Sequence, residues 1–208
     1  SGAEEKHVDL AVRWSHTFGD WDIGLSHFIG TNRNPRFLPN FDANNNLFLT
    51  PYYEQIQQTG LDIQVTKEDM LWKFEAISRQ GQKENFIAMT GGLEYTFVGV
   101  LDSDADLGVL VEYLFDDRDE KASTPFENDI MLGMRLALND VQSTELLFGT
   151  ILSMENESNS YLLEASRRFG DNWKISLEAY VYSNITPSDL MYGMRNEDFM
   201  QLTLAWYF

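Results

Sequence analysis

Three histidines, His7, His16 and His27, are the side chains of this sequence best suited to acid–base or metal chemistry. His16 and His27 stand in two similar stretches, WSHTFG and LSHFIG, which suggests paired metal ligands or part of a catalytic triad. A hairpin at FGDW would place His16 opposite about Ile23 and His27 opposite about Val12, so the two rings would lie several residues apart. Both histidines also share the parity of their apolar neighbours. We therefore interpret them as histidines of an interface rather than of a catalytic site.

A second candidate is the run of carboxylates Asp116, Asp117, Asp119 and Glu120, which could hold Ca²⁺. Such a charge run is more often simply solvated, and that interpretation is preferred here. The sequence contains no Gly-x-Ser-x-Gly elbow, His-Glu-x-x-His helix or phosphate-binding loop. No catalytic, cofactor-binding or metal-binding residue is therefore assigned, and the chain is not expected to be an enzyme.

The composition excludes several classes of protein. The 208 residues include 15 basic and 33 acidic ones, a formal net charge of −18, so nucleic acid is an improbable partner and cations are attracted instead. The absence of cysteine rules out disulfides and thiolate metal sites. No stretch approaches the roughly 18 consecutive apolar residues that a transmembrane helix needs.

The main structural signal is alternation of apolar and polar residues over segments of about ten residues, separated by turn sequences. In ADLGVLVEYLF, for example, Leu107, Val109, Val111, Tyr113 and Phe115 fall on one side of an extended strand. No period of 3.6 residues competes with this pattern. The sequence predicts an all-β, antiparallel, up-and-down fold with about 11–12 strands in a single domain over residues 1–208.

The other side of the predicted strands is polar and carries most of the charges. A soluble barrel would expose that side to water, whereas a membrane barrel would enclose it and turn the apolar side toward lipid. In the second case the following residues are expected to line the lumen: Asp62, Lys73, Glu75, Glu94, Glu112, Arg135, Glu145, Glu164, Arg168, Lys174 and Glu178. Pairing about the turns further places Arg135 near Glu145, Glu145 near Arg168 and Lys73 near Asp62, a ladder of opposite charges across neighbouring strands.

The connections and the aromatic residues favour the membrane alternative. Tight links such as FGDW and FGDNW take turns with long polar segments such as DDRDEKASTPFEND. Aromatic residues gather near the short links (Phe18, Trp21, Trp72, Phe97, Phe169, Trp173 and Trp206) and near the long ones (Phe28, Tyr53, Phe86, Tyr113, Phe115 and Tyr182). Two such bands are typical of the two interfaces of a membrane.

The last residues, MQLTLAWYF, combine a terminal phenylalanine with apolar residues at every second position: Met200, Leu202, Leu204, Trp206 and Phe208. This ending resembles the C-terminal signature of Gram-negative outer-membrane β-barrel proteins, the signal that their assembly machinery reads. The resemblance implies a location in the cell outer membrane. It also implies outer-membrane lipid, lipopolysaccharide and the assembly machinery as partners, and it implies no cofactor.

The resemblance also sets an orientation, because the terminal phenylalanine of this family lies at the periplasmic rim. Counting back, the strand that begins near Val8 would start outside, although barrels of this type usually have an even strand number and both termini in the periplasm. The chain is therefore expected to lack at least one N-terminal strand, supplied by a longer precursor or a second chain, unless the count has missed one.

Three functions are compatible with this interpretation. The first is a porin or channel for small polar or cationic solutes, since carboxylates outnumber bases on the enclosed side. The second is a structural or transport-complex barrel, completed or plugged by another segment or protein. The third is an outer-membrane hydrolase with its site in the long loops.

Overall fold

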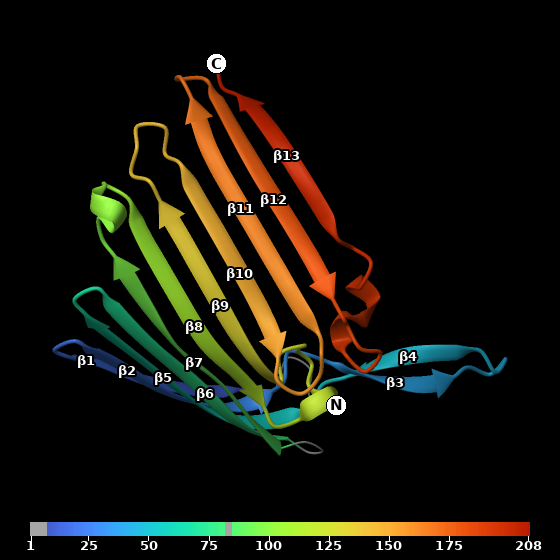
Figure 1. The fold of residues 1–208 in the computed structure, drawn as a ribbon. Helices are drawn as coiled ribbons and strands as arrows, with labels where there is room; N and C mark the ends of the chain where they lie inside the picture. The colour runs from blue at the N-terminus through green and yellow to red at the C-terminus, as the bar shows by residue number, and fades with distance from the viewer. Residues whose placement is uncertain (1–7, 82–84) are drawn as a thin grey trace.

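The computed structural model describes residues 8–81 and 85–208 of the chain. Eleven strands pair in chain order into one antiparallel sheet, and two more form a separate hairpin (Figure 1). The strands of the large sheet are β1 (Leu10–Phe18), β2 (Trp21–Thr31), β5 (Gln55–Lys67), β6 (Met70–Gly81), β7 (Asn85–Phe97), β8 (Asp106–Asp116), β9 (Asn128–Ala137), β10 (Glu145–Ser153), β11 (Asn159–Phe169), β12 (Trp173–Ser183) and β13 (Phe199–Trp206). The hairpin consists of β3 (Arg36–Phe41) and β4 (Leu47–Tyr52). Elsewhere in the described residues lie the short 3₁₀ turns η2 (Val100–Asp102), η3 (Asp119–Lys121) and η4 (Leu190–Met194).

The predicted all-β antiparallel fold is confirmed. The large sheet has eleven strands, within the expected 11–12, and the β3–β4 hairpin adds two that were not expected as a separate unit. A barrel closed by this chain is not confirmed. The sheet is open, with β1 and β13 at its opposite margins in Figure 1. Because the eleven strands are successively antiparallel, β1 and β13 run in the same direction and cannot form an antiparallel pair. Membrane insertion, and a strand missing ahead of β1, stay predictions.

The register keeps the apolar positions of the alternating pattern of all eleven strands on a single face, which we call the apolar face. Leu204 of β13 stands opposite Ile175 of β12, and Val111 of β8 stands opposite Leu132 of β9. Because side chains alternate along a strand, the charged residues collect on the opposite face, called the polar face from here on. The alternation in the sequence is thus one continuous two-sided surface in space.

The apolar face is exposed, and the described residues form only a small buried core. Their buried hydrophobic residues are Ile56, Phe86, Ala105, Ala122 and Ile185, whereas Leu202 of the apolar face is 66% exposed. The accessible surface is 14482 Å², against about 9,900 Å² expected for a compact monomer of this mass. Most large apolar side chains of the described residues are therefore not packed in a core of this chain.

The polar face is the inner, more crowded side of the curved sheet. The strand residues buried on it include Gly24, Gly60, Phe86 and Asp129, while Thr150 is the buried strand residue of the apolar face. Gly24 shows why glycine is used here. A Cβ at this position would lie 2.2 Å from Oδ2 of Asp62 and 2.7 Å from Nη2 of Arg13, so a larger residue cannot fit without moving these side chains.

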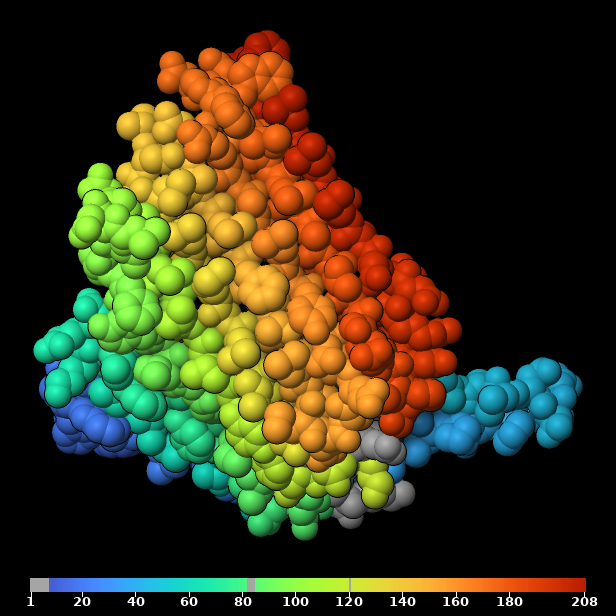
Figure 2. Space-filling model, in the orientation of Figure 1, coloured from blue at the N-terminus to red at the C-terminus, as the bar shows by residue number. Residues whose placement is uncertain are grey.

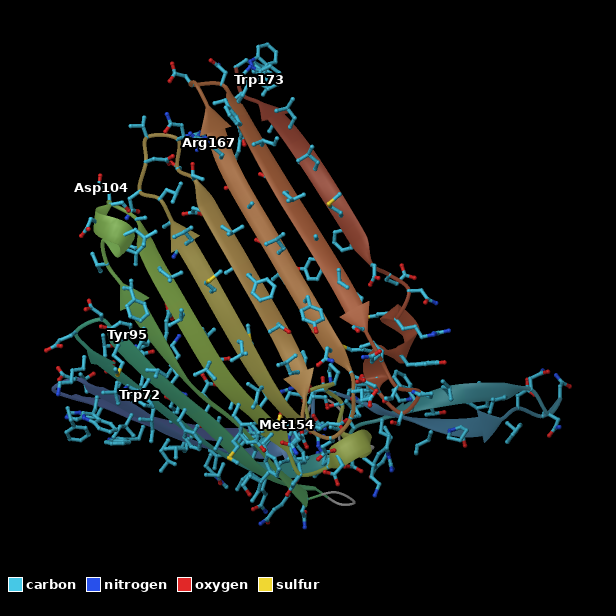
Figure 3. All side chains as sticks on the ribbon, in the orientation of Figure 1. Trp72, Tyr95, Asp104, Met154, Arg167 and Trp173 are labelled. Atoms are coloured by element: carbon cyan, nitrogen blue, oxygen red, sulfur yellow. The ribbon has the colours of Figure 1, made fainter. Side chains whose placement is uncertain are left out.

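The two ends of the sheet differ in their connections. Tight turns at 19–20, 68–69 and 170–172 lie at the end that holds the C-terminus, while the segments 117–127 and 184–198 lie at the other end, called the loop end. Figure 3 shows Trp173, Arg167 and Trp72 along the short-turn margin and Met154 at the loop end. The alternation is less regular than expected, because segment 98–105 contains η2 and the loop-end segment 154–158 is short.

The β3–β4 hairpin forms an arm that projects from the rest of the molecule (Figure 2). Its base is closed by the hydrogen bond from the Asn32 amide to the Glu54 carbonyl, at 2.8 Å. One side of the arm is entirely apolar, because its cross-strand pairs are Phe37 with Pro51, Pro39 with Leu49 and Phe41 with Leu47. Both strands of the arm are edge strands, which is where a strand tolerates proline.

The aromatic bands are confirmed at one end of the sheet only. The seven aromatic residues expected near the short turns all lie on the apolar face and are 43–57% exposed. At the loop end, Tyr113 and Phe115 share the apolar face, but Phe28, Phe86 and Tyr182 lie on the polar face. The prediction of a second band is wrong for these three residues, because their parity along the strand turns them to the polar face.

Replacing Gly24 by valine should destabilise the fold by about 1–3 kcal/mol, because the new side chain collides with Asp62 and Arg13. Gly149→Ala is the matched control: it lies on the same face, and its nearest neighbour, Cβ of Leu162, would be 4.0 Å away. Urea unfolding followed by tryptophan fluorescence measures both. Equal stability of the two variants would contradict the crowding inferred for the polar face.

Candidate functional site

All eleven residues expected to line a lumen lie on the polar face. The register places Asp62 opposite Glu75, Arg168 opposite Lys174, and Glu164 opposite Glu178, with the other members in the same parity along their strands. This shared side follows from the alternation that the sequence shows. That the face encloses a lumen stays a prediction.

One cluster of charges lies at β1, β2 and β5. Nη2 of Arg13 is 2.9 Å from Oδ2 of Asp62, and the pair passes over Gly24 of the intervening strand. Lys73 lies diagonally across from Asp62, since it stands opposite Gln64, but the two form no ion pair among the described residues. The sequence-based prediction did not include Arg13 among the residues of this face. The signal was present, because Arg13 directly follows Val12 of the apolar face and must point to the opposite side.

Another cluster lies at β9, β10, β11 and β12. The predicted pair of Arg135 with Glu145 is confirmed, with Nη2 3.3 Å from Oε1 and both side chains more than half exposed. The predicted pair of Glu145 with Arg168 is not formed: Glu145 faces Ser166, and Arg168 faces Lys174. Exposed pairs of this kind contribute about 0.2–1 kcal/mol, so this one orients charge more than it stabilises the fold.

Glu164 and Glu178 stand directly opposite each other on β11 and β12. Neither carboxylate has an ion pair within the part of the chain that the structure describes. Together with Lys174 and the Arg135–Glu145 pair, they line a hollow of about 380 Å³ on the polar face. Like charges directly across a strand pair cost stability, and a cation from solution would relieve that repulsion.

Further carboxylates extend this acidic surface toward β7 and β8. Glu112 folds over Gly92, where a Cβ would lie 2.4 Å from Cγ of Glu112. Gly92 is paired with Glu112 on one side and with Lys73 on the other. Lys73 is therefore the base nearest to the Glu112 carboxylate in the line of paired residues that crosses these strands. Glu94 and Glu75 add charge on the neighbouring positions, and the polar face is therefore acidic overall.

Asp116 is buried at the loop end in an arrangement unlike a calcium site. Its Oδ1 accepts hydrogen bonds from the Arg118 amide at 3.1 Å and from Nε of Arg118 at 2.8 Å. The guanidinium carbon of Arg118 lies 3.6 Å from the ring centroid of Phe86, while that of Arg79 lies 5.2 Å from it.

Asp117, the next carboxylate of the run, accepts a hydrogen bond from the amide of Ile87 at 2.9 Å. No group of side chains suited to a metal ion occurs among the described residues. The Glu120 side chain lies outside what is described.

Carboxylates also crowd at the rim of the loop end. Burial raises the pKa of Glu127, and the nearby charges of Glu155, Asp189, Asp129 and Asp119 raise it further.

At the short-turn end the pKa of a carboxylate is lowered instead. The Thr144 amide and hydroxyl and then the Arg167 guanidinium lower the pKa of Asp140. Arg167 belongs to the apolar face, and its Nη1 reaches Oδ2 of Asp140 at 3.6 Å, so its head group bends toward the turn at the rim.

The two described histidines belong to the apolar face. His16 stands opposite Ile23 and His27 opposite Val12, as the hairpin at FGDW predicted. The ring of His16 lies 4.2 Å from that of Phe18, and Nδ1 of His27 lies 2.9 Å from Oγ1 of Thr59. The rings therefore belong to separate contacts and do not form a joint site. His7 lies outside the described residues.

Comparison with protein-family models, with curated proteins and with solved structures finds no match. Within the described residues, no helix is long and apolar enough to cross a membrane. The site is therefore interpreted from the geometry of its own residues.

Removing the guanidinium of Arg118 should cost about 3–5 kcal/mol, because Arg118→Met leaves the buried Asp116 carboxylate without its partner. Arg167→Met is the matched control. Its pair with Asp140 is partly exposed, so a loss below about 1 kcal/mol is expected. Chemical denaturation of both variants gives the comparison, and similar losses would mean that Arg118 does not stabilise the loop end.

Proposed function

We propose that this chain forms a large part of the wall of an outer-membrane β-barrel of porin or channel type. The apolar face meets lipid, and the polar face lines a water-filled path for small polar or cationic solutes. The observation that carries the proposal is the one-sidedness of the sheet: exposed apolar side chains cover its outer side, and charged ones cover its inner side. Lipid on one side and water on the other is the environment in which that distribution costs least.

The extent of the exposed apolar surface supports lipid contact over exposure to water. Leu10, Leu25, Leu132, Phe148 and Leu202 lie on five different strands of the apolar face, and each is 36–66% exposed. Soluble monomers seldom expose apolar patches larger than a few hundred Å², and this one extends over the entire sheet. The strand lengths, 8 to 13 residues, include the range of about 9–11 that crosses a bilayer.

The charge of the polar face supports a preference for cations. Carboxylates outnumber bases on it, and the Glu164–Glu178 pair lacks an ion pair among the described residues. In a narrow aqueous path with low-dielectric walls, unpaired carboxylates raise the local concentration of cations. Selectivity would therefore depend on β11 and β12 more than on the paired charges of β9 and β10.

The location and the partners follow from the same proposal. The chain would reside in the outer membrane of a Gram-negative bacterium and contact lipid and lipopolysaccharide. Met200, Leu202, Leu204 and Trp206 of β13 lie on the apolar face and are 57–77% exposed, and Phe208 is fully exposed. This arrangement leaves the C-terminal signature free for the assembly machinery to bind.

A structural or transport-complex barrel is the second candidate, because one connection covers part of the polar face. Between β8 and β9, Thr124 and Phe126 line a hollow together with Ala88 and Leu114 of the polar face, and Ala122 is 5% exposed. A segment folded over the inner side at the loop end would narrow an opening there. No specific observation favours the third expectation, an outer-membrane hydrolase.

Neutralising the carboxylate pair should weaken cation preference. Glu164→Gln with Glu178→Gln is expected to shift the zero-current potential in a salt gradient toward zero, because the fixed negative charge of the path falls. Removing the repulsion should leave stability unchanged or raise it by about 0.2–1 kcal/mol. Planar-bilayer recordings of the protein purified from membranes measure the shift. Glu197→Gln, outside the sheet, is the control. The absence of channel steps in the parent protein would contradict the pore.

Replacing Phe208 by serine should reduce the amount of folded protein in the outer membrane. The apolar alternation that ends at Phe208 is the feature proposed to be read during assembly. Tyr207→Ser is the matched control, because Tyr207 is also exposed but has the opposite parity. Immunoblots of fractionated membranes measure both variants. Normal assembly of Phe208→Ser would contradict the assembly signal.

A further inference from the structure

Two basic residues interrupt the apolar face of the large sheet, among the strand residues that the structure describes. Lys67 ends β5, and Arg167 lies near the end of β11. A charged side chain on the lipid side of a strand costs free energy that grows with depth, so its position often marks a function. In the membrane setting proposed above, on which this inference rests, the surroundings of these two bases are therefore the places where the apolar face could hold a polar group.

Arg167 lies at the rim of a hollow of about 460 Å³ in the apolar face. The floor of this hollow is Ala165, which has Leu146 opposite it on β10 and Leu177 opposite it on β12. The short side chain between two leucines leaves the space open. The walls are apolar side chains: Leu136, Leu138, Leu146, Ile175, Leu177 and Leu202. The volume falls in the range of about 300–1,000 Å³ that is typical of sites for small molecules.

The guanidinium of Arg167 has donors available at this rim. Its Nη1 lies 3.6 Å from Oδ2 of Asp140, which is longer than a hydrogen bond, and its carbon lies 5.9 Å from the ring centroid of Phe169. The oxygens of Asp140 instead accept hydrogen bonds from the amide and the hydroxyl of Thr144, each at 2.7 Å. Asp140 therefore steers the guanidinium without occupying its planar fork of donors, which matches a phosphate group in two parallel hydrogen bonds.

The neighbouring charges indicate that the ligand needs an apolar part as well as a phosphate. The charge of Asp140 offsets part of the charge of Arg167, so a free phosphate ion would gain little there. Glu145 also lines the hollow, but its carboxylate pairs with Arg135 of the polar face. Burial of an alkyl chain against the leucines of the hollow supplies the remaining affinity.

The depth of Arg167 along the strands suits a lipid headgroup. Between Arg167 and the short turns lies one row of paired aromatic residues, Phe169, Trp173 and Trp206. Figure 3 shows Arg167 and Trp173 at this margin of the sheet. Tryptophan residues concentrate at the headgroup level of membranes. The guanidinium thus lies at the level of lipid phosphates, and Ala165 lies on the hydrocarbon side of it.

We propose that this hollow binds one glycerophospholipid with an anionic headgroup. The phosphate accepts hydrogen bonds from the guanidinium of Arg167, and one acyl chain lies over Ala165. Under the proposed orientation this end of the sheet faces the periplasm, and the periplasmic leaflet of an outer membrane consists of glycerophospholipid. Lys67 does not line the hollow and is followed by Glu68 and Asp69, so it lacks both features of the site.

Native mass spectrometry of the protein, purified from membranes in detergent, tests the proposal. The unchanged protein should bind one dioleoyl phosphatidylglycerol about tenfold more tightly than dioleoyl phosphatidylcholine, whose headgroup has no net charge. Arg167→Met should lower the affinity for phosphatidylglycerol about tenfold and remove the preference. Ala165→Phe should weaken both lipids, because its ring fills the hollow. Equal affinity for the two lipids in the unchanged protein, or an unchanged affinity in either variant, would overturn the proposal.

Lys67→Met and Ala179→Phe are the matched controls. The first removes the other base of the apolar face, and the second adds a ring to that face outside the hollow. Both should bind phosphatidylglycerol as the unchanged protein does. A loss in Lys67→Met equal to that in Arg167→Met would overturn the site, because overall charge would then attract the lipid. A loss in Ala179→Phe equal to that in Ala165→Phe would overturn it too.

Two other occupants of the hollow have their own outcomes in the same measurement. An excess of inorganic phosphate should leave the lipid bound. Displacement of the lipid would overturn the proposal, because the phosphate alone would then account for the affinity. A protein dimer that Ala165→Phe dissociates would also overturn it, because a second copy of the chain would then cover the hollow.

The outcome is separable from that of the pore. Channel steps from a protein without lipid preference would keep conduction and reject the lipid site. A preference for phosphatidylglycerol that depends on Arg167, in a protein without channel steps, would keep the lipid site and reject conduction.

Discussion

The structure depends on one constraint, the unbroken hydrogen-bonded register between neighbouring strands. Side chains alternate every residue, so a slip of one position in any pair would turn the apolar residues of all later strands to the other face. From β1 to β13 no such slip occurs: Trp14 stands opposite Leu25, Leu25 opposite Leu61, and the same parity reaches Leu204. The register thus converts a local pattern into one surface for an apolar environment and one for a polar environment.

The inner surface shows how charge is accommodated on the crowded side of such a sheet. Gly24 leaves space through which Arg13 reaches Asp62 two strands away, and Gly92 leaves space for Glu112. Not all charges are paired in this way. The opposition of Glu164 and Glu178 has a cost in stability that simple packing would avoid. Natural sequences tend to retain local conflicts of this kind where they serve function.

The sequence allowed the strands, their faces and short-range pairing to be predicted. Arg135 and Glu145 flank one connection, so counting residues outward from that connection was sufficient to predict that they lie close together. The same count from the turn after Phe169 would have placed Glu164 opposite Glu178. The Arg13–Asp62 pair was not predicted, because it spans β2 and the connection from β2 to β5 contains the arm. The open sheet agrees with the strand count, which placed the first and last strands in the same direction, although no local pattern of residues shows this.

The β3–β4 arm has a consequence for how this molecule can change over time. Thr31 and Gln55 stand opposite each other at the base of the arm, and the register of β2 with β5 is set by residues below that point. Insertions or deletions in the arm therefore leave the register of the large sheet unchanged. The arm is the part of the chain where the surface exposed at the loop end can diversify freely, while the sheet that carries it stays the same.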